Sequence, residues 1–341
     1  MIHKTKQVTI YDIAKILNIS AATVSRALAG NVDVKSDTRE KILDAANAMG
    51  YSSNNFASNL RKKQSKMVGV IVHRLNSHFL AETLAGIEKS LNMAGYHMII
   101  SQSHESVAAE INATKAMLKN RVDGLLVSLC YDNDTTKHFD ELIKQGVPVV
   151  FFDRTPNEGE YDNVKIDNFK AGYEMTMHLI KQSYQRILHI TASQQRDVYA
   201  DRLAGYKQAL QDSKIPFNED LVLVTDLSPQ YGIEAANYIK NMQTLPDAVF
   251  AVNDFLAVSC MKELQRMNIR VPEDIAFAGF NNDPVSTLTT PSLTTVNYDG
   301  LKMGQLAART LLTKLTEKAS NKSHVVMPYE LVIRNSSVKD D

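Results

Sequence analysis

The chain is short of the residues that mark secreted, membrane-bound or disulfide-stapled proteins. Its 341 residues include only two cysteines, Cys130 and Cys260, which are too few and too isolated for a disulfide framework or a metal site. Their apolar surroundings favour buried free thiols. No run of about 18 apolar residues is present, so no transmembrane helix is expected. The N-terminus lacks the apolar core of a signal segment, and we therefore expect a cytoplasmic protein without a membrane partner.

The signatures of common enzymes on α/β folds are missing as well. No GxGxxG loop follows the first predicted strand, and neither a P-loop nor a GxSxG turn appears. No paired carboxylates stand out, and no metal-ligand spacing surrounds His78. We predict that the protein is not an enzyme and holds no cofactor or metal.

The net charge is zero, but the charges are unevenly distributed along the chain. Residues 1–66 carry eleven lysines and arginines against five acidic residues, a net charge of +6. The rest of the chain carries 27 basic and 33 acidic groups, a net charge of −6. A basic head on an acidic body favours a nucleic-acid partner for the head alone.

The basic head begins with two predicted short helices joined by a tight turn, between Thr9 and Leu28. Thr9 and Asp12 have the spacing of a capping box, and Asn18 tolerates the left-handed backbone that the turn requires. Ser20 is expected to cap the second helix. The outward face of that helix is small, polar and positive, as a helix entering a major groove needs, although two amphipathic helices also occur in ordinary domains.

A third helix is predicted from Ser36 or Asp37 to Met49, which completes a small all-α head over residues 1–50. Residues 51–66 then form a polar, basic stretch that cannot bury enough surface to fold alone. This stretch is either a flexible linker or a segment that folds only when bound.

From Met67 onward, short apolar runs alternate with amphipathic helical segments. Buried parallel strands give such runs, and the alternation predicts doubly wound α/β units with parallel sheets. One unit begins at Met67 and a second near Asp167. Two such units side by side leave a cleft at the carboxyl ends of their strands.

The chain resembles the LacI/GalR family of bacterial transcription regulators along essentially its whole length. The matching stretches, in order, are VTIYDIAKILNIS-AATVSRAL, TREKILDAANAMGY, NNFASNL, VDGLL, FFDR, VNDFLA, VPEDIAFAGF and PSLTTV. The resemblance implies a helix-turn-helix head (1–50), a hinge (51–66) and a core (67–337) resembling periplasmic sugar-binding proteins. In that core, crossings near 166, 297 and 325 would divide subdomain N (67–166 and 298–324) from subdomain C (167–297 and 325–337).

The resemblance also implies a homodimer that binds a pseudo-palindromic operator in double-stranded DNA. The protein would be a repressor controlled by a small sugar-like effector, and a nucleoside effector remains open. The C-terminal stretch IRNSSVKDD carries no heptad pattern, so a dimer is expected rather than a tetramer tethered by a coiled coil.

Matching positions give candidate DNA-binding residues. Arg26 is the strongest candidate for reading a base, because arginine bonds guanine O6 and N7 in a bidentate manner; a phosphate contact is the alternative. Ala21 and Ala22 stand where the family varies its operator sequence, and Leu60 resembles the family's minor-groove wedge. The further candidates, most of them expected to position the phosphate backbone, are Thr9, Tyr11, Thr23, Ser25, Asn31, Asn54 and Ala57.

Matching positions likewise give candidate effector-binding residues in the cleft. An aromatic ring can stack on the apolar face of a sugar, and arginines and amides can bond its hydroxyls. The five candidates are Phe79, Arg154, Arg202, Asn253 and Asn281. Second choices are Asn76, Ser77, His78 and Asp153. Asp254 either contacts the ligand or caps the helix expected to begin at 255.

The sequence departs from the family pattern at the hinge and in the cleft. Ser53 stands where the family usually has proline, which removes a fixed φ and some preorganisation. Asn281 and Asn282 replace the usual aspartates, and an uncharged Asn281 makes a cationic ligand group less favourable.

Two other functions compete with an effector-controlled repressor. A solute-binding protein of a transport system would have the same core, but the basic head and the missing signal segment argue against it. A regulator controlled by a protein corepressor on the core surface is the other alternative.

Overall fold

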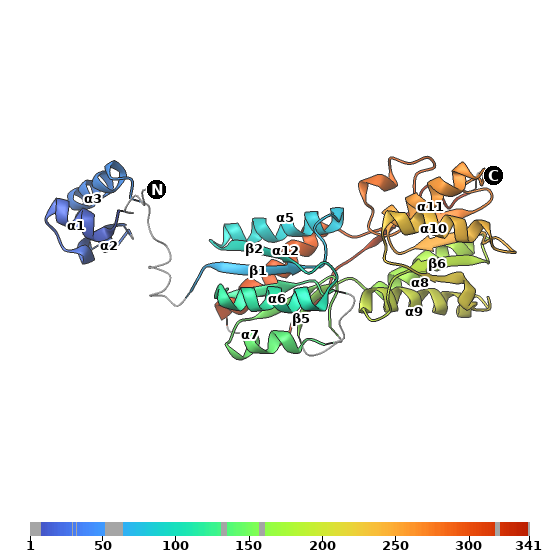
Figure 1. Cartoon of the computed structure of the whole chain (residues 1–341), viewed down its shortest axis with the longest axis horizontal. Coiled ribbons are helices and arrows are strands. Elements are labelled where there is room, and N and C mark those ends of the chain that lie inside the picture. Colours follow the sequence, from blue (N-terminus) through green and yellow to red (C-terminus); the bar gives the residue numbers. More distant parts are fainter. Residues whose placement is uncertain are drawn as a thin grey trace, which may run out of the picture. The chain divides into compact units, whose positions relative to one another are not determined.

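The computed structural model describes residues 8–28, 30–31, 33–51, 64–130, 135–156, 161–317 and 321–339. They belong to two compact units, Met1–Ser65 and Lys66–Asp341, which we call the head and the core (Figure 1). The predicted hinge residues Ser53, Asn54, Ala57 and Leu60 lie outside the described residues.

The described part of the head contains three helices, α1 (Ile10–Leu17), α2 (Ala21–Leu28) and α3 (Ser36–Ala48). The predicted capping box is confirmed: the Asp12 carboxylate accepts the Thr9 backbone N–H at 2.8 Å. Asn18 adopts the left-handed conformation with φ 54°, as the turn requires.

Each head helix contributes a fully buried β-branched side chain to one small core: Ile13 from α1, Val24 from α2 and Ile42 from α3. The predicted cap of α2 is also present, since the Thr23 N–H donates to Ser20 Oγ at 3.1 Å. This core fixes α2 against its neighbours.

The first half of the core, here the N lobe, is built on a six-stranded parallel sheet in the order β11-β5-β4-β3-β1-β2. Its strands are β1 (Met67–Val72), β2 (His97–Gln102), β3 (Gly124–Val127), β4 (Val149–Phe152), β5 (Asp162–Lys165) and β11 (His324–Val326). Its helices are α5 (His78–Met93), α6 (Val107–Lys119), α7 (Asp140–Lys144) with the short η1 (Lys137–Phe139) before it, and α12 (Gly300–Glu317).

Alternate residues of the central strand face the two sides of this sheet, as a doubly wound fold requires. Val70 and Val72 lie in a cluster with α5 and α12, whereas Ile71 lies in a cluster with α6 and α7. The prediction of a doubly wound unit is confirmed for this lobe.

The second half, the C lobe, has a four-stranded parallel sheet in the order β7-β6-β8-β9. Its strands are β6 (Ile187–Thr191), β7 (Val222–Val224), β8 (Ala248–Ala251) and β9 (Ala276–Ala278). Its helices are α8 (Asn168–Lys181), α9 (Asp197–Asp212), α10 (Pro229–Lys240) and α11 (Asp254–Arg266), with the short η2 (Glu219–Leu221) and η3 (Pro284–Ser286). Arg196 is the N-cap of α9.

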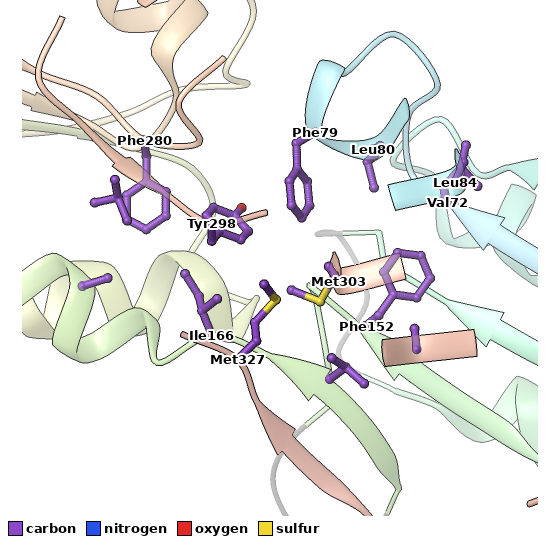
Figure 2. Close-up of a cluster of buried hydrophobic side chains, with 14 of the residues drawn as sticks. Val72, Phe79, Leu80, Leu84, Phe152, Ile166, Phe280, Tyr298, Met303 and Met327 are labelled. Atoms are coloured by element: carbon purple, nitrogen blue, oxygen red, sulfur yellow. The ribbon is translucent and has the colours of Figure 1, made fainter. Parts of the chain in front are cut away.

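Three chain segments connect the lobes, and each carries a buried side chain into one shared apolar cluster. These side chains are Ile166, Tyr298 and Met327, which Figure 2 shows together between the lobes. Beside them, β10 (Thr295–Asn297) pairs antiparallel with β12 (Glu330–Val332). Because β11 pairs with β5 as far as Val326, the third connection follows Val326 and not 325, where we expected it.

Glycines let the covering helices pack closely. A Cβ on Gly304 of α12 would meet the Thr83 carbonyl oxygen of α5 and come within 2.8 Å of the Ile87 nitrogen. In the C lobe, a Cβ on Gly205 of α9 would lie 2.6 Å from the Tyr173 nitrogen of α8. In each lobe, therefore, a glycine without a Cβ allows two neighbouring helices to pack closely.

Candidate functional site

Four of the eight candidate DNA-binding residues in the described part of the head are exposed to solvent. Tyr11 is 71% exposed, and Thr9, Ala22 and Arg26 are exposed as well. Arg26 makes a weak bond along its own helix, from Nε to the Ala22 carbonyl at 3.4 Å. Its guanidinium therefore keeps donors for a partner.

Other head candidates are less open. Ala21 is half-buried and packs against the head core. Thr23 and Ser25 are half-buried, and the Thr23 hydroxyl is 2.8 Å from that of Ser20. Asn31 is half-buried, accepts the Asp33 N–H at 3.2 Å and offers its carbonyl to the Arg39 guanidinium. These bonds orient the ends of α2 and α3.

The core contains a cavity of about 230 Å³ between its two lobes. All five candidate effector residues line this cavity, and so do the four second choices. They come from segments far apart in sequence, and they meet because both sheets end here. Its lining also includes residues that we did not predict, among them His73, Arg74, Tyr199, Asp283 and Tyr298.

Aromatic rings form one wall of the cavity. Phe79 lies at the start of α5, 4.6 Å from the Tyr298 ring between centroids, and Phe280 lies 5.7 Å from Tyr298 on the other side. Figure 2 shows Tyr298 between these two phenylalanines. Tyr298 follows β10 in one of the connections, a position that carries no local motif.

Arg154 is 4% exposed and bonded on several sides. Its Nη1 donates to both Glu105 carboxylate oxygens, at 3.0 and 2.8 Å, and its Nη2 donates to the Tyr199 hydroxyl at 2.6 Å. Tyr199 belongs to the C lobe and Glu105 to the N lobe. Arg154 therefore ties the lobes together at the cavity.

Arg202 is 2% exposed and stands on the C-lobe side. Its Nε donates to Asn168 Oδ1 at 2.9 Å, and its Nη1 donates to the Val252 carbonyl at 3.0 Å. The guanidinium lies 3.4 Å from the centroid of the Phe280 ring, a cation–π arrangement. These contacts hold its plane fixed against the cavity.

Asn253 lines the cavity as expected and has a second role as a helix cap, whereas Asp254 has neither of the roles we considered. Asn253 is the N-cap of α11, since its Oδ1 accepts the Leu256 N–H at 3.1 Å. Asp254 does not cap the helix and does not line the cavity; it is buried and accepts bonds from the Asp283 N–H and the Thr295 hydroxyl, both at 2.7 Å. Because its oxygen is held by the cap, the group of the Asn253 side chain left to bond a ligand in the cavity is the amide nitrogen, a donor.

Asn281 lies at the end of β9 with φ 103°, a backbone conformation that side-chain-bearing residues rarely adopt. Its Oδ1 accepts the Tyr298 hydroxyl at 3.1 Å. The aromatic wall thus orients this amide.

Asp153 and His73 form a buried polar pair through Ser128. The Ser128 hydroxyl lies 3.5 Å from Asp153 Oδ2 and 3.2 Å from His73 Nδ1. Burial raises the pKa of Asp153 to about 6, against the opposing effect of Arg154 and Arg202. Burial, with Arg154 and Arg74 nearby, holds the pKa of His73 well below its usual value, so this imidazole is neutral.

Among the residues that the structure describes, no group of three or more histidines, cysteines or acidic residues is placed to hold a metal ion. In the same ranges, no helix is both long and apolar enough to span a bilayer. Cys130 and Cys260 are both buried free thiols, as expected.

Comparison with known proteins agrees with this architecture. The family "Bacterial regulatory proteins, lacI family" matches residues 9–54, and "Periplasmic binding protein-like domain" matches residues 176–337. Catabolite control protein A of Priestia megaterium is 31% identical, covering 97% of this chain and 99% of the relative. The crystal structure of the lac repressor dimer bound to operator and the anti-inducer ONPF is similar, with a TM-score of 0.88 and 25% identity over 98% of this chain and 100% of that one. The CelR–cellobiose complex, a transcriptional regulator, has a TM-score of 0.73 and 26% identity over 97% of this chain and 100% of that one.

A helix-turn-helix head joined to a two-lobed core like a periplasmic binding protein defines a DNA-binding transcriptional regulator and not an enzyme. The chain belongs to the LacI/GalR family of such regulators. A transport role is therefore set aside, because family membership covers the head as well as the core.

Proposed function

We propose that the protein is a repressor whose operator binding is controlled by a sugar or sugar-like metabolite bound between the lobes of the core. The observation that carries this proposal is the convergence of Phe79, Arg154, Arg202, Asn253 and Asn281 on one cavity. A ring wall beside donor groups suits a molecule with apolar faces and hydroxyl edges. Its small volume favours a compact ligand.

The effector would act by changing how the lobes are held. Arg154 of the N lobe bonds Tyr199 of the C lobe, and Thr155 bonds Asp197 at 2.7 Å across the same boundary. A ligand that competes for these groups changes the balance between lobe arrangements, which is the differential binding that allosteric control requires. The hinge over residues 51–66, with Leu60 as a minor-groove wedge, would transmit the change to the head.

The repressor would work in the cytoplasm as a homodimer, with α2 of each head in the major groove of one operator half-site. Large apolar side chains on the core support a second copy as the partner. Met93 at the end of α5 is 84% exposed, Ile100 on the edge strand β2 is 41% exposed, and Leu288 after η3 is 83% exposed. Sedimentation of the full chain tests this point, since a concentration-independent monomer or tetramer contradicts it.

The experiment that tests the function is a selection of DNA fragments by the full-length protein, repeated with neutral sugars and nucleosides at matched concentrations. A recovered pseudo-palindrome whose retention changes with one compound supports the proposal. A pseudo-palindrome that no compound affects would leave the DNA-binding role standing and reject small-molecule control.

A further inference from the structure

The charges around the cavity balance only when one residue outside its lining is included. Three arginines line the cavity, Arg74, Arg154 and Arg202, against two carboxylates, Asp153 and Asp283. The histidine nearest to the arginines, His73, is neutral because burial lowers its pKa. The missing carboxylate belongs to Glu105, whose side chain is 8% exposed.

Glu105 contacts two of the three arginines at once. Its carboxylate accepts two bonds from Arg154 Nη1, at 3.0 and 2.8 Å, and lies 3.5 Å from Arg74 Nε. Arg74 in turn donates to the Asp226 carbonyl of the C lobe at 3.0 Å. One carboxylate therefore holds two guanidinium groups that border the cavity.

The backbone that carries Glu105 is unusual. His104 and Glu105 are consecutive non-glycine residues in the left-handed region, with φ 52° and 58°. Such residues cost free energy, and they persist where the surrounding structure requires them. Here the turn between β2 and α6 aims the carboxylate at the arginines.

This arrangement changes what the cavity can bind. Arginine is a strong receptor for phosphate and carboxylate because its planar fork matches two oxygens. With Glu105 in place, an anion would have to displace a buried carboxylate or lie close to it. A hydroxyl-bearing neutral molecule meets no such repulsion.

We propose that Glu105 is a specificity-determining residue that reserves the cavity for neutral ligands and excludes phosphorylated or carboxylated ones. This inference rests on the proposed effector function. It identifies the class of ligand through Glu105, whose negative charge repels anionic molecules.

The test compares inorganic phosphate binding to the full-length wild type and to Glu105→Gln, at constant ionic strength with chloride as the balancing ion. Glutamine keeps the size and a hydrogen-bond acceptor but removes the charge. Phosphate affinity, followed by calorimetry and by the rise in unfolding temperature, is expected to increase about tenfold or more in the variant, as removal of a unit charge a few ångströms away implies.

Two further variants locate the effect. Glu263→Gln removes a carboxylate that pairs with Arg266 far along α11, and it should bind phosphate no better than wild type. Arg74→Gln added to Glu105→Gln should remove most of the gain. Equal phosphate affinity in wild type and Glu105→Gln, whether strong or absent, overturns the proposal, and so does an equal gain in Glu263→Gln.

A measurement on the wild type covers the case in which Glu105→Gln does not fold. The neutral compound that changes operator retention is titrated beside its phosphate ester, and the ester should bind at least about tenfold more weakly. An ester that binds as tightly contradicts the role of Glu105. The phosphate experiment needs neither operator nor effector, so it can fail while the proposed function stands, and the reverse also holds.

Discussion

Tyr11 and Arg26 of the head are open to solvent, whereas Arg154 and Arg202, which line the core cavity, are buried and already bonded within the protein. Tyr11 is 71% exposed, and among the described residues the Arg26 side chain makes one hydrogen bond, to its own helix at 3.4 Å. Arg154 and Arg202 are 4% and 2% exposed, and each has at least two internal partners. The head thus presents groups to a partner, while the core must exchange internal bonds when a ligand enters.

This difference separates two kinds of variant. Removing an exposed head side chain weakens DNA binding without disturbing the head core. Changing a buried core residue alters stability and ligand binding together, since the same atoms serve both.

Gly304→Ala should destabilise the core by about 3 kcal/mol, because the new methyl group meets the backbone of α5 and neither helix can move without the sheet. Chemical denaturation of the full chain, monitored by circular dichroism, measures this loss. Gly95→Ala is the control: its Cβ meets nothing within 4 Å, so only the strain of φ 72° remains, about 1 kcal/mol. Equal losses in the two variants would contradict the close packing of α5 and α12.

Arg26→Ala should weaken operator binding by about 1–3 kcal/mol and relax preference at one base pair per half-site. Thermal unfolding of the head should stay unchanged, because the Arg26 side chain is exposed. Binding to the selected operator and to single-base variants measures both effects. A uniform weakening across all sequences would make Arg26 a phosphate contact.

Asp153→Asn should stabilise the core at neutral pH by about 1–2 kcal/mol and weaken the effector response. Asparagine tolerates the left-handed backbone of this position, φ 59°. A carboxyl group whose pKa is higher in the folded than in the unfolded protein stabilises the fold fully at pH values below its unfolded pKa of 3.8. This contribution to the free energy of unfolding is lost as the pH rises through the folded pKa of about 6.

The gap in unfolding free energy between Asp153→Asn and wild type should therefore widen between pH 4 and pH 6. Denaturant unfolding at several pH values measures the gap. A difference in unfolding free energy that does not change with pH would mean that burial does not raise the pKa of Asp153.

Thr9→Ala should cost the head about 1 kcal/mol by removing half of the capping box of α1. Hydrogen exchange of head amides should speed up while core amides keep their rates. Faster exchange in the core would show that the two units do not respond separately.

The head could be predicted from sequence in detail because its determinants are local. Thr9 with Asp12, Asn18 at the turn and Ser20 before α2 each act within a few residues, and all four behave as expected.

The core was predictable in its alternation of strands and helices, but the roles of its cavity residues were not. Glu105 acts through its bonds to Arg154, which lies 49 positions further along the chain. Tyr298 acts through ring contacts with Phe79 of the N lobe and Phe280 of the C lobe. Asn253 caps α11 in addition to lining the cavity, and Asp254 does neither, because the Asp283 N–H and the Thr295 hydroxyl bond its carboxylate. Such partners are set by packing, which no local pattern reveals.

The central claim, that a ligand in the cavity controls DNA binding, is tested most directly by operator affinity in wild type and Asn253→Ser, each with and without the effector. Serine keeps a capping oxygen for α11 but lacks the amide group of Asn253, which lines the cavity. The two proteins should bind operator equally without effector, and the effector should change wild-type affinity about 5- to 150-fold while leaving the variant nearly unchanged. A variant that responds like wild type would contradict the claim.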